Sequence, residues 1–457
     1  MGCPRIVHPS GEKAMSIARR FAAGLLAAPL LASTAHAVPV TLQNPTATFH
    51  QGNFGSVDQT VDGNTATGGM GFFNNRTGNT TIVYETAGDL AAGELLTLDL
   101  FQNLGVGHTL QKFRVSVTDA DRSLFADGNP APGSEAPAGD VDPTPGSFTV
   151  LRPTFGTTTG GSTVTVDDSG FISITGANPA TSRYTLQFLN EVSQTTGLRI
   201  EVAPGTNGFV GRSSGAPHNS NGNAVITELT LDTAPAGTFN VGLQNATASF
   251  SQNFNATTGA VALAIDANPA SGWSIFRGSG DASQAENAVF ETLADIGNAS
   301  ATQLNFQLDF LSQFSQHVLG RFRLYATTDD RSTFADGLGT GGDVTANWTL
   351  LDDYLSFSTA NGSTLIPQGD GSFLLSGLNP AQERLSVSLL TTLKNITGFR
   401  LEAMTDPSFP TSGPGRSANG NFVLTNFAVS ASLIPEPASA TLACAAGLAL
   451  IVRRRRA

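Results

Sequence analysis

Most of the chain alternates apolar and polar residues with a period of two, which is the pattern of half-buried β-strands. Residues 112–118 (KFRVSVT) place every second side chain on one face, and residues 321–327 (RFRLYAT) repeat this arrangement. Further strands are expected at residues 96–100, 148–151, 162–166, 171–175, 184–188, 198–202 and 224–231. Clusters of Gly, Asn, Asp and Pro separate these segments, and no long stretch has the period of a helix. The pattern predicts antiparallel all-β structure.

The same phrases occur twice, about 200 residues apart. Residues 108–128 align without gaps with residues 317–337, and 12 of the 21 aligned positions are identical. A period of this length fits a whole domain rather than the unit of a solenoid. We therefore predict two tandem antiparallel jelly-roll β-sandwich domains, at residues 38–234 and 238–433, joined by a linker at 235–237.

The N-terminal end has the order of a secretory signal peptide. Arg19 and Arg20 precede an apolar stretch at 21–31, and Ala35-His36-Ala37 has the small-x-small form of a cleavage site. Residues 1–14 lack this pattern, which favours Met15 as the start. A twin-arginine signal is the alternative, although the residues around the Arg pair fit it poorly. Residues 1–37 are therefore expected to form a signal helix that is removed on export.

The C-terminal end combines three features in a fixed order. They are Pro435-Glu436-Pro437, an apolar segment at 438–452, and the cluster Arg453, Arg454, Arg455 and Arg456. At ~1.5 Å per residue, a helix of this segment spans about 22 Å. A hydrocarbon core is ~30 Å thick, so the segment suits a transient membrane stop better than a permanent span.

The order of these three features resembles the PEP-CTERM sorting signal. The resemblance implies that residues 434–457 hold the chain in the inner membrane until an exosortase recognises the Pro-Glu-Pro motif and removes the tail. The export machinery and an exosortase are then the expected partners, and the cell envelope, cell surface or extracellular matrix is the expected destination. A plain membrane anchor at 438–452 is the alternative.

Composition and charge exclude several classes of protein. The chain has 24 Lys and Arg against 36 Asp and Glu, 50 Gly, and 13% charged residues, about half the usual share. The two ends contain eight of the basic and two of the acidic residues, so the part between them has 16 basic and 34 acidic residues, a formal charge of −18 rather than −12. This balance argues against nucleic acid as a main partner. Cys3 and Cys444 lie in the ends, which excludes disulfides and cysteine-bound zinc between them.

One loop resembles a known family. Residues 265–273 (IDANPASGW) look like the D-G-N-P-x-T-x-W loop of discoidin-like domains in the galactose-binding-like superfamily, and residues 290–292, 317–324 and 420–425 are similar to a bacterial branch of it. The resemblance implies a jelly-roll sandwich that binds carbohydrate through loops at one end. The residues it makes candidates for ligand binding are Asp266, Asn268 and Trp273, with Asp62 and Asn64 in the first copy.

The first copy departs from this loop. Gly69 stands where the second copy has Trp273, and Thr65 stands where it has Pro269. If Trp273 stacks on a sugar, the first copy lacks that platform. The alternative is that Trp273 is a core aromatic residue at the start of a strand.

Acidic loops give the metal hypothesis. The matched carboxylates are Asp121, Asp127 and Asp140 in the first copy and Asp330, Asp336 and Asp343 in the second. Calcium takes six to eight oxygen ligands, which clustered carboxylates and loop carbonyls could supply. Asp also forms Asx-turns in such loops, and this is the alternative. Structural calcium is the single cofactor that the sequence suggests.

Signatures of enzymes are weak. Residues 211–215 (GRSSG) match G-x-S-x-G, but a nucleophile elbow needs a strand before it and a helix after it. Pro and Gly flank the motif, and the second copy, at 415–419, loses its last Gly, so a polar loop is predicted. His108 and His317 match between copies and have no partner at metal-ligand spacing, so we expect each to bond to backbone.

Two matched arginines, Arg114 and Arg323, are expected to face outward from equivalent strands. They could meet an acidic polysaccharide, but cross-strand carboxylates such as Asp99 and Asp309 are the favoured partners.

Together these features predict a non-enzymatic exported protein of the cell surface or matrix that binds polysaccharide through its two repeats. A structural spacer without a specific ligand is the first alternative. A polysaccharide hydrolase that uses an acidic pair such as Asp329 and Asp330 is the second, although only the abundance of Asp favours it.

Overall fold

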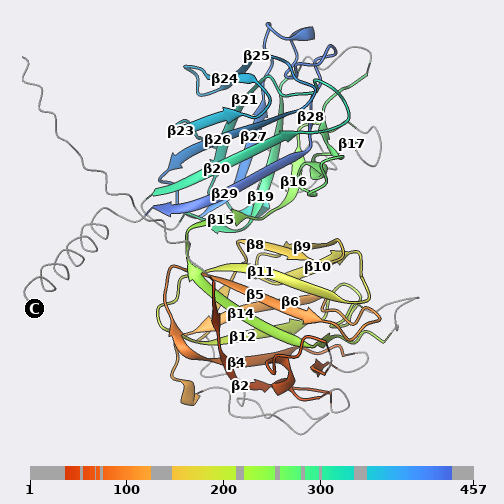
Figure 1. Ribbon diagram of the computed structural model, residues 1–457, viewed down its shortest axis with the longest axis vertical. Helices are drawn as coiled ribbons and strands as arrows, with labels where there is room; N and C mark the ends of the chain where they lie inside the picture. The colour runs from red at the N-terminus through yellow and green to blue at the C-terminus, as the bar shows by residue number, and fades with distance from the viewer. Residues whose placement is uncertain are drawn as a thin grey trace, which may run out of the picture. The chain divides into compact units, whose positions relative to one another are not determined.

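The computed structural model describes residues 37–51, 55–66, 68–72, 76–124, 147–212, 221–252, 258–278, 284–297, 301–333 and 347–434. Its regular elements there are strands and five short 3₁₀ turns, as the alternating pattern predicts (Figure 1). No helix among these residues is long and apolar enough to cross a membrane. Ala35 of the expected cleavage site and the whole sorting signal from Pro435 onward lie outside the described residues, whereas Ala37 is exposed at the start of the first strand.

The first repeat contains two antiparallel sheets. One has the order β1 (Val38–Val40), β14 (Glu228–Pro235), β5 (Glu94–Gln102), β11 (Ser182–Asn190) and β8 (Phe155–Thr158). The other has the order β2 (Leu42–Ala47), β4 (Thr80–Leu90), β12 (Thr195–Ala203), β6 (Lys112–Thr118), β10 (Ile172–Gly176) and β9 (Ser162–Val166), with β7 (Thr149–Leu151) beside β6. A short ladder joins β3 (Met70–Gly71) to β13 (Val225–Ile226).

The second repeat has the same topology. Its first sheet has the order β15 (Thr238–Val241), β29 (Asn426–Ile434), β20 (Ala301–Phe310), β26 (Glu383–Thr391) and β23 (Tyr354–Thr359). Its second sheet has the order β16 (Leu243–Ala248), β19 (Glu286–Ile296), β27 (Ile396–Ala403), β21 (Arg321–Thr327), β25 (Phe373–Gly377) and β24 (Ser363–Pro367), with β22 (Thr349–Leu350) beside β21. A small sheet joins β17 (Thr258–Gly259), β18 (Gly272–Ser274) and β28 (Val423–Leu424).

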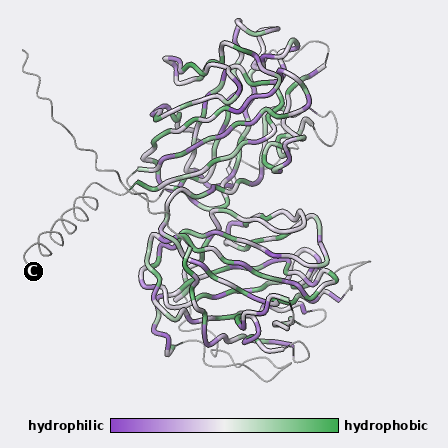
Figure 2. The backbone as a smooth tube through the Cα atoms, in the orientation of Figure 1, coloured by the Kyte–Doolittle hydropathy of each residue, from purple (hydrophilic) through white to green (hydrophobic). Residues whose placement is uncertain are grey.

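Alternation along each strand separates the core from the outer faces, and Figure 2 shows hydrophobic and hydrophilic positions following one another along the strands. In β20, Leu304, Phe306 and Leu308 are at most 1% exposed, while the residues between them face outward. Phe rings fill the space between the sheets of the second repeat; those of Phe290 and Phe427 stack with centroids 4.3 Å apart. Phe suits this position because it has no polar atom that needs a partner. The all-β sandwich prediction is confirmed.

One expected strand is divided in two. Residues 224–231 form β13 and then β14, with Thr227 between them. The Thr227 hydroxyl lies 3.1 Å from the carbonyl oxygen of Phe101 and accepts the N–H of Asn103 at 3.2 Å. These bonds replace regular strand pairing at Thr227, where the chain passes from the short ladder of β3 and β13 into the five-stranded sheet that contains β14. The apolar pattern continues through the break, so periodicity alone could not reveal it.

The repeated Leu-Gln-Asn phrases have a structural explanation. Asn44 and Asn245 have φ of 46° and 47°, and each lies in an irregularity between the first strand of its sheet and the next one. The side-chain amide of Asn44 donates to Glu85 at 3.0 Å, and that of Asn245 donates to Glu291 at 2.8 Å. Asn tolerates the left-handed region better than most residues. The two copies therefore share these residues because both must form the same bulge.

Candidate functional site

The loop that resembles discoidin-like domains places Trp273 in the core. Its side chain is 0% exposed, its ring N–H donates to the carbonyl oxygen of Phe250 at 3.0 Å, and its ring meets Phe422 edge to face at 5.1 Å. This placement leaves neither face of the indole open to a sugar, so Trp273 cannot be the stacking platform. At the matched position, a Cβ on Gly69 would lie 2.1 Å from the carbonyl oxygen of Ile226, so the first copy has no room for a side chain there.

The polar residues of this loop form turns. Asp266 accepts the backbone N–H of Asn268 at 2.8 Å and the Ser271 hydroxyl at 2.6 Å, and Asn268 accepts the N–H of Ala270 at 3.1 Å. In the first copy, Asp62 and Asn64 accept backbone N–H groups two residues ahead in the same way, at 2.8 and 3.1 Å. These are Asx-turns, in which the side chains stabilise the loop itself.

A residue that the sequence did not single out lies beside this loop in the first repeat. Glu228, on β14, is only 3% exposed, and its two carboxylate oxygens lie 3.3 and 3.2 Å from the backbone nitrogen of Gly63. Burial, and then the nearby Asp62 carboxylate, raise the pKa of Glu228 to about 7. Register places Asn426 at the matching position of the second repeat, so this carboxylate belongs to one copy alone.

In the described parts of the two acidic loops, the aspartates form Asx-turns rather than a cluster of ligands. Asp121 accepts the backbone N–H and the hydroxyl of Ser123 at 2.9 and 2.6 Å, and Asp330 does the same with Ser332. These bonds lower the pKa of both carboxyl groups. The other four candidates, Asp127, Asp140, Asp336 and Asp343, lie outside the described residues. The described part contains no group of three or more His, Cys, Asp or Glu placed to hold a metal ion, so calcium stays a prediction.

The matched histidines bond to backbone. The Nδ1 atom of His108 lies 3.1 Å from the carbonyl oxygen of Gly105, and that of His317 lies 3.0 Å from the carbonyl oxygen of Ser315. This agrees with the loop role expected for both residues.

The serine of the G-x-S motif is buried in the second repeat. The Ser417 hydroxyl is 2.6 Å from both the Asn419 side-chain oxygen and the Asn421 carbonyl oxygen, and the residue is 3% exposed. The neighbouring Arg416 donates to the carbonyl oxygens of Leu378 and Gly377 at 2.7 and 2.8 Å. The motif thus fastens a loop to the β24–β25 hairpin. Ser213 of the first copy lies outside the described residues.

Replacing Gly415 with alanine should destabilise the second repeat by about 2 kcal/mol, because the new Cβ would lie 2.0 Å from the carbonyl oxygen of Asn421. Urea unfolding followed by tryptophan fluorescence measures this, since both tryptophans belong to the second repeat. Gly369→Ala is the matched control, because a Cβ there meets nothing within 4 Å. Equal effects of the two substitutions would contradict the prediction.

The outward arginines pair with carboxylates other than those predicted. Arg114 bonds to Glu201 at 2.5 Å, and Arg323 bonds to Asp370 at 2.6 Å. Asp99 and Asp309 instead pair with arginines on β11 and β26. The reason is topological: β5 and β6 belong to opposite sheets, as do β20 and β21, so neither predicted pair shares a face.

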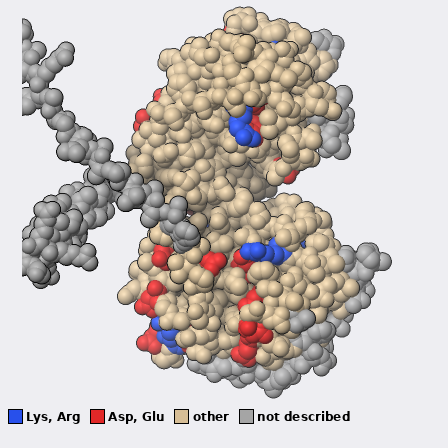
Figure 3. Space-filling model, in the orientation of Figure 1, with Lys and Arg blue, Asp and Glu red and all other residues tan. Residues whose placement is uncertain are grey.

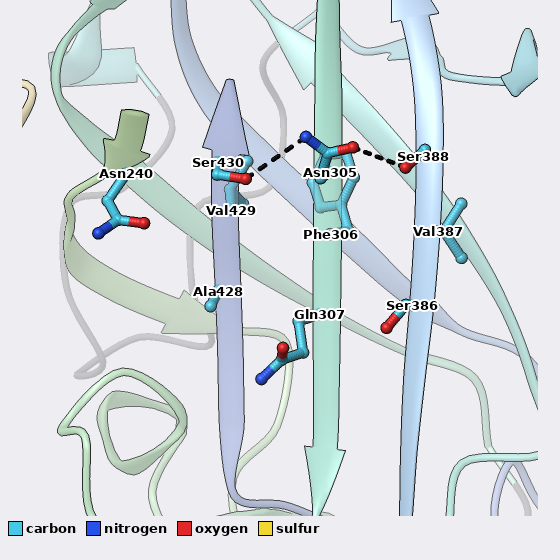
Figure 4. A pocket seen from close by; sticks show the side chains of 10 residues that line it. All are labelled: Asn240, Asn305, Phe306, Gln307, Ser386, Val387, Ser388, Ala428, Val429 and Ser430. Carbon is cyan, nitrogen blue, oxygen red and sulfur yellow. Dashed lines mark hydrogen bonds between the residues drawn. The ribbon is translucent and has the colours of Figure 1, made fainter. Parts of the chain in front are cut away.

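A hollow of about 210 Å³ lies on the outer face of the first sheet of the second repeat (Figure 4). Its lining residues are Asn240, Asn305, Phe306, Gln307, Ser386, Val387, Ser388, Ala428, Val429 and Ser430. They come from β15, β29, β20 and β26. The outward side chains among them are amides, hydroxyls and one methyl group, so the hollow has no charged lining residue.

Asn305 is the centre of this hollow. Register places it between Ser388 on β26 and Ser430 on β29. Its side-chain oxygen accepts the Ser388 hydroxyl at 2.6 Å and the Gln303 amide at 2.9 Å, and its amide nitrogen lies 3.4 Å from the Ser430 hydroxyl oxygen. The dashed lines in Figure 4 show the two serine bonds on either side of the strand. This network fixes the orientation of the amide.

Gln307 occupies the next outward position, between Ser386 and Ala428. Its amide donates to Asp309 at 3.0 Å, and Asp309 is neutralised by Arg384, whose Nε atom is 2.7 Å away. Small side chains on both flanking strands leave space above the two amides. In Figure 3 this side of the second repeat is largely uncharged, apart from one patch of basic atoms beside acidic atoms and a few acidic atoms near its edges.

The first repeat has no equivalent set of residues. Register places Thr97 at the position of Asn305, with Gln187 and Asp232 where the second repeat has Ser388 and Ser430. These flanking side chains are larger, and one is charged. The sequence contained a signal for the site, namely amides at the alternate positions 303, 305 and 307, which the structure places on β20, but nothing in it identified the flanking serines.

Comparisons with known proteins found similar solved structures but no similar sequence family. No protein-family model matches the chain, and no curated protein does. Among solved structures, it is similar to the CBM32-1 and CBM32-2 domains from Clostridium perfringens ZmpB, at 8% identity over 85% of this chain and 92% of that chain, with a TM-score of 0.24. A fucolectin from striped bass (Morone saxatilis) serum gives 11% identity, 86% and 97% coverage, and a TM-score of 0.19.

Allantoicase gives 9% identity, 86% and 89% coverage, and a TM-score of 0.23. The similar structures thus include carbohydrate-binding modules, a lectin and an enzyme. With TM-scores of this size, the function of this chain rests on its own residues.

Proposed function

We propose that the protein is a non-catalytic carbohydrate-binding protein whose second repeat binds a neutral polysaccharide in the hollow over β20. The observation that supports this is the pair of outward amides, Asn305 and Gln307, in a concave and uncharged sheet face flanked by small residues. Sugar hydroxyls both donate and accept hydrogen bonds, and side-chain amides offer both functions in a fixed geometry. Recognition of a neutral sugar needs such groups and no charge.

The amides retain hydrogen-bonding capacity. An amide group has two donor hydrogens and two acceptor lone pairs. Within the described part of the chain, Asn305 uses both lone pairs and one hydrogen, so one N–H is left. Gln307 donates one bond there, so its oxygen and its second hydrogen are left. A bound sugar chain could use these groups without disturbing the sheet.

The proposal extends to the location of the protein. The order of cleavage site, double sandwich, Pro-Glu-Pro motif and basic tail supports export and exosortase-dependent sorting to the cell envelope or matrix. A polysaccharide-binding domain would then meet its ligand outside the cell. Mass spectrometry of the envelope protein tests this, because sorting predicts a C-terminus near Pro435, and an intact Arg456 would contradict it.

Binding is tested with the full chain on an array of neutral polysaccharides, followed by titration of the best ligand. The double variant Asn305→Ala/Gln307→Ala should bind at least tenfold more weakly, since each lost hydrogen bond contributes about 1 kcal/mol. Thr97→Ala/Thr185→Ala, on the matching face of the first repeat, should change nothing. No binding to any neutral polysaccharide, or equal affinity of the two variants, would contradict the proposal and favour a spacer.

A further inference from the structure

Arg400 lies on the outer face of the other sheet of the second repeat. It is an outward residue of β27, directly opposite Tyr325 on β21. Its guanidinium carbon is 4.0 Å from the centroid of the Tyr325 ring and 5.3 Å from that of the Trp348 ring. Arg400 and Trp348 are both partly exposed. The cation therefore contacts two aromatic rings at a partly exposed place.

Arg400 differs from the other arginines of its repeat. Among the described residues, five of them form ion pairs with carboxylates and the sixth donates to backbone carbonyls: Arg277, Arg321, Arg323, Arg331 and Arg384, and then Arg416. For Arg400 the same residues provide neither an ion pair nor a hydrogen bond, and its Nε atom is buried without a partner. A guanidinium has five donor hydrogens, so this group has unused capacity.

The carboxylate that follows Arg400 on β27 interacts with residues other than Arg400. Glu402, the next outward residue of β27, accepts the Tyr325 hydroxyl at 2.8 Å and lies 3.6 Å from the guanidinium of Arg323. Arg323 in turn bonds to Asp370 at 2.6 Å. Glu402 and Asp370 are thus engaged by Arg323 and Tyr325, and within the part of the chain that the structure describes neither carboxylate forms an ion pair with Arg400.

The first repeat has a reduced version of this arrangement. Arg199 lies over the ring of Phe148 at 4.3 Å, and register places Ser116 opposite it, where the second repeat has Tyr325. Phe148 likewise stands where the second repeat has Trp348, since each residue comes immediately before the threonine that begins the short strand β7 or β22. Among the residues that the structure describes, an arginine opposite a tyrosine and next to a tryptophan is therefore found in the second repeat.

We infer that Arg400, Tyr325 and Trp348 form a second binding site, which takes a sugar bearing a carboxylate, that is, a uronic acid. A guanidinium fixed in one plane suits a carboxylate, because two parallel N–H groups can bond to its two oxygens. The partly exposed indole of Trp348 offers an apolar surface against which the sugar ring can lie. This site differs in sheet, chemistry and ligand from the neutral hollow and does not depend on it.

The chain offers an internal probe for this site. It has two tryptophans, of which Trp273 is fully buried and Trp348 touches Arg400. Titration of the full chain with sodium glucuronate at low salt should give a saturable change in tryptophan fluorescence, whereas glucose should give none. Arg400→Gln should weaken glucuronate binding at least tenfold, and Arg199→Gln, the matched change in the first repeat, should leave it unaltered.

Three further measurements make the result decisive. Trp348→Phe should remove the fluorescence response, and sodium acetate should bind more weakly than glucuronate because it lacks the sugar ring. The Asn305→Ala/Gln307→Ala variant should titrate like the unmodified chain, so failure of the neutral site and of this site can be told apart. The inference is overturned by an equal response to glucose, by acetate binding as tightly as glucuronate, or by unchanged affinity in a folded Arg400→Gln variant.

Discussion

Replacing Glu383 with alanine is expected to destabilise the second repeat by about 3–5 kcal/mol, the cost of breaking a buried charged network. Glu383 is 0% exposed, and its carboxylate accepts backbone N–H groups from Ala360, Asn361, Ser363 and Arg384 at 2.9, 2.7, 3.2 and 3.0 Å. Without the carboxylate these donors lose their partner in a buried place. Urea unfolding followed by tryptophan fluorescence reports on this repeat specifically.

Two controls separate the carboxylate from simple loss of packing. Glu383→Gln retains the shape and an acceptor oxygen, so it should cost clearly less than Glu383→Ala. Register places Ser182 at the matching position of the first repeat, where its hydroxyl donates a bond to the carbonyl oxygen of Thr159 at 3.1 Å, so Ser182→Ala should cost about 1 kcal/mol. Hydrogen exchange of the β11 amides measures this cost, because both tryptophans belong to the second repeat. If Glu383→Ala costs no more than Ser182→Ala, the carboxylate does not organise this hairpin.

The carboxylate also makes the second repeat sensitive to acid. Burial acts to raise the pKa of Glu383, but hydrogen bonds from Ser363, Asn361 and Arg384 outweigh it and lower the pKa below its usual value. A carboxyl group with a lowered pKa in the folded state stabilises the fold above its unfolded pKa and loses that contribution as the pH falls. The difference in the free energy of unfolding between the unmodified protein and the Glu383→Gln variant should therefore become smaller as the pH falls.

The fold could be predicted because, in many strands of a β-sandwich, apolar residues that face the core alternate with polar residues that face the solvent. The expected strands at 112–118 and 321–327 coincide with β6 and β21, since alternation there is uninterrupted. The long strand β4 (Thr80–Leu90) was not predicted, because its residues 82–84 are consecutively buried and the alternation is lost. Alternation therefore predicts a strand where apolar and polar residues follow one another in the sequence, as in β6, and misses one whose sequence has consecutive apolar residues, as in β4.

The candidate sites could be predicted only in part, because they depend on contacts between distant residues. Asn305 meets Ser388 and Ser430, which follow it by 83 and 125 residues. A single sequence cannot show that register. The indole of Trp273 was visible in a motif, but whether it faces outward or inward depends on Phe250 and Phe422, which pack around it. Partners across sheets, as for Arg114, are likewise set by topology rather than by spacing.

Replacing Glu228 with glutamine is expected to stabilise the first repeat at pH 8 by up to about 3 kcal/mol. The pKa of this carboxyl group is raised from 4.5 to about 7 by burial and by Asp62, and each unit corresponds to about 1.36 kcal/mol. The folded state therefore disfavours the ionised form. The contribution of Glu228 to the stability of this repeat is greatest below pH 4.5, falls as the pH rises from 4.5 to about 7, and stays low above that.

Glutamine cannot ionise, and its side-chain oxygen can still accept the N–H of Gly63, so Glu228→Gln should lack this fall. The two proteins should have equal stability near pH 4.5 and differ most at pH 8, as measured by hydrogen exchange of the β14 amides across that range. Asp62→Asn removes the neighbouring charge and should reduce the pH dependence without abolishing it, because burial is the larger cause. A constant difference between Glu228→Gln and the unmodified chain at every pH would show that the substitution acts through packing, and that the raised pKa of Glu228 does not govern the stability of this repeat.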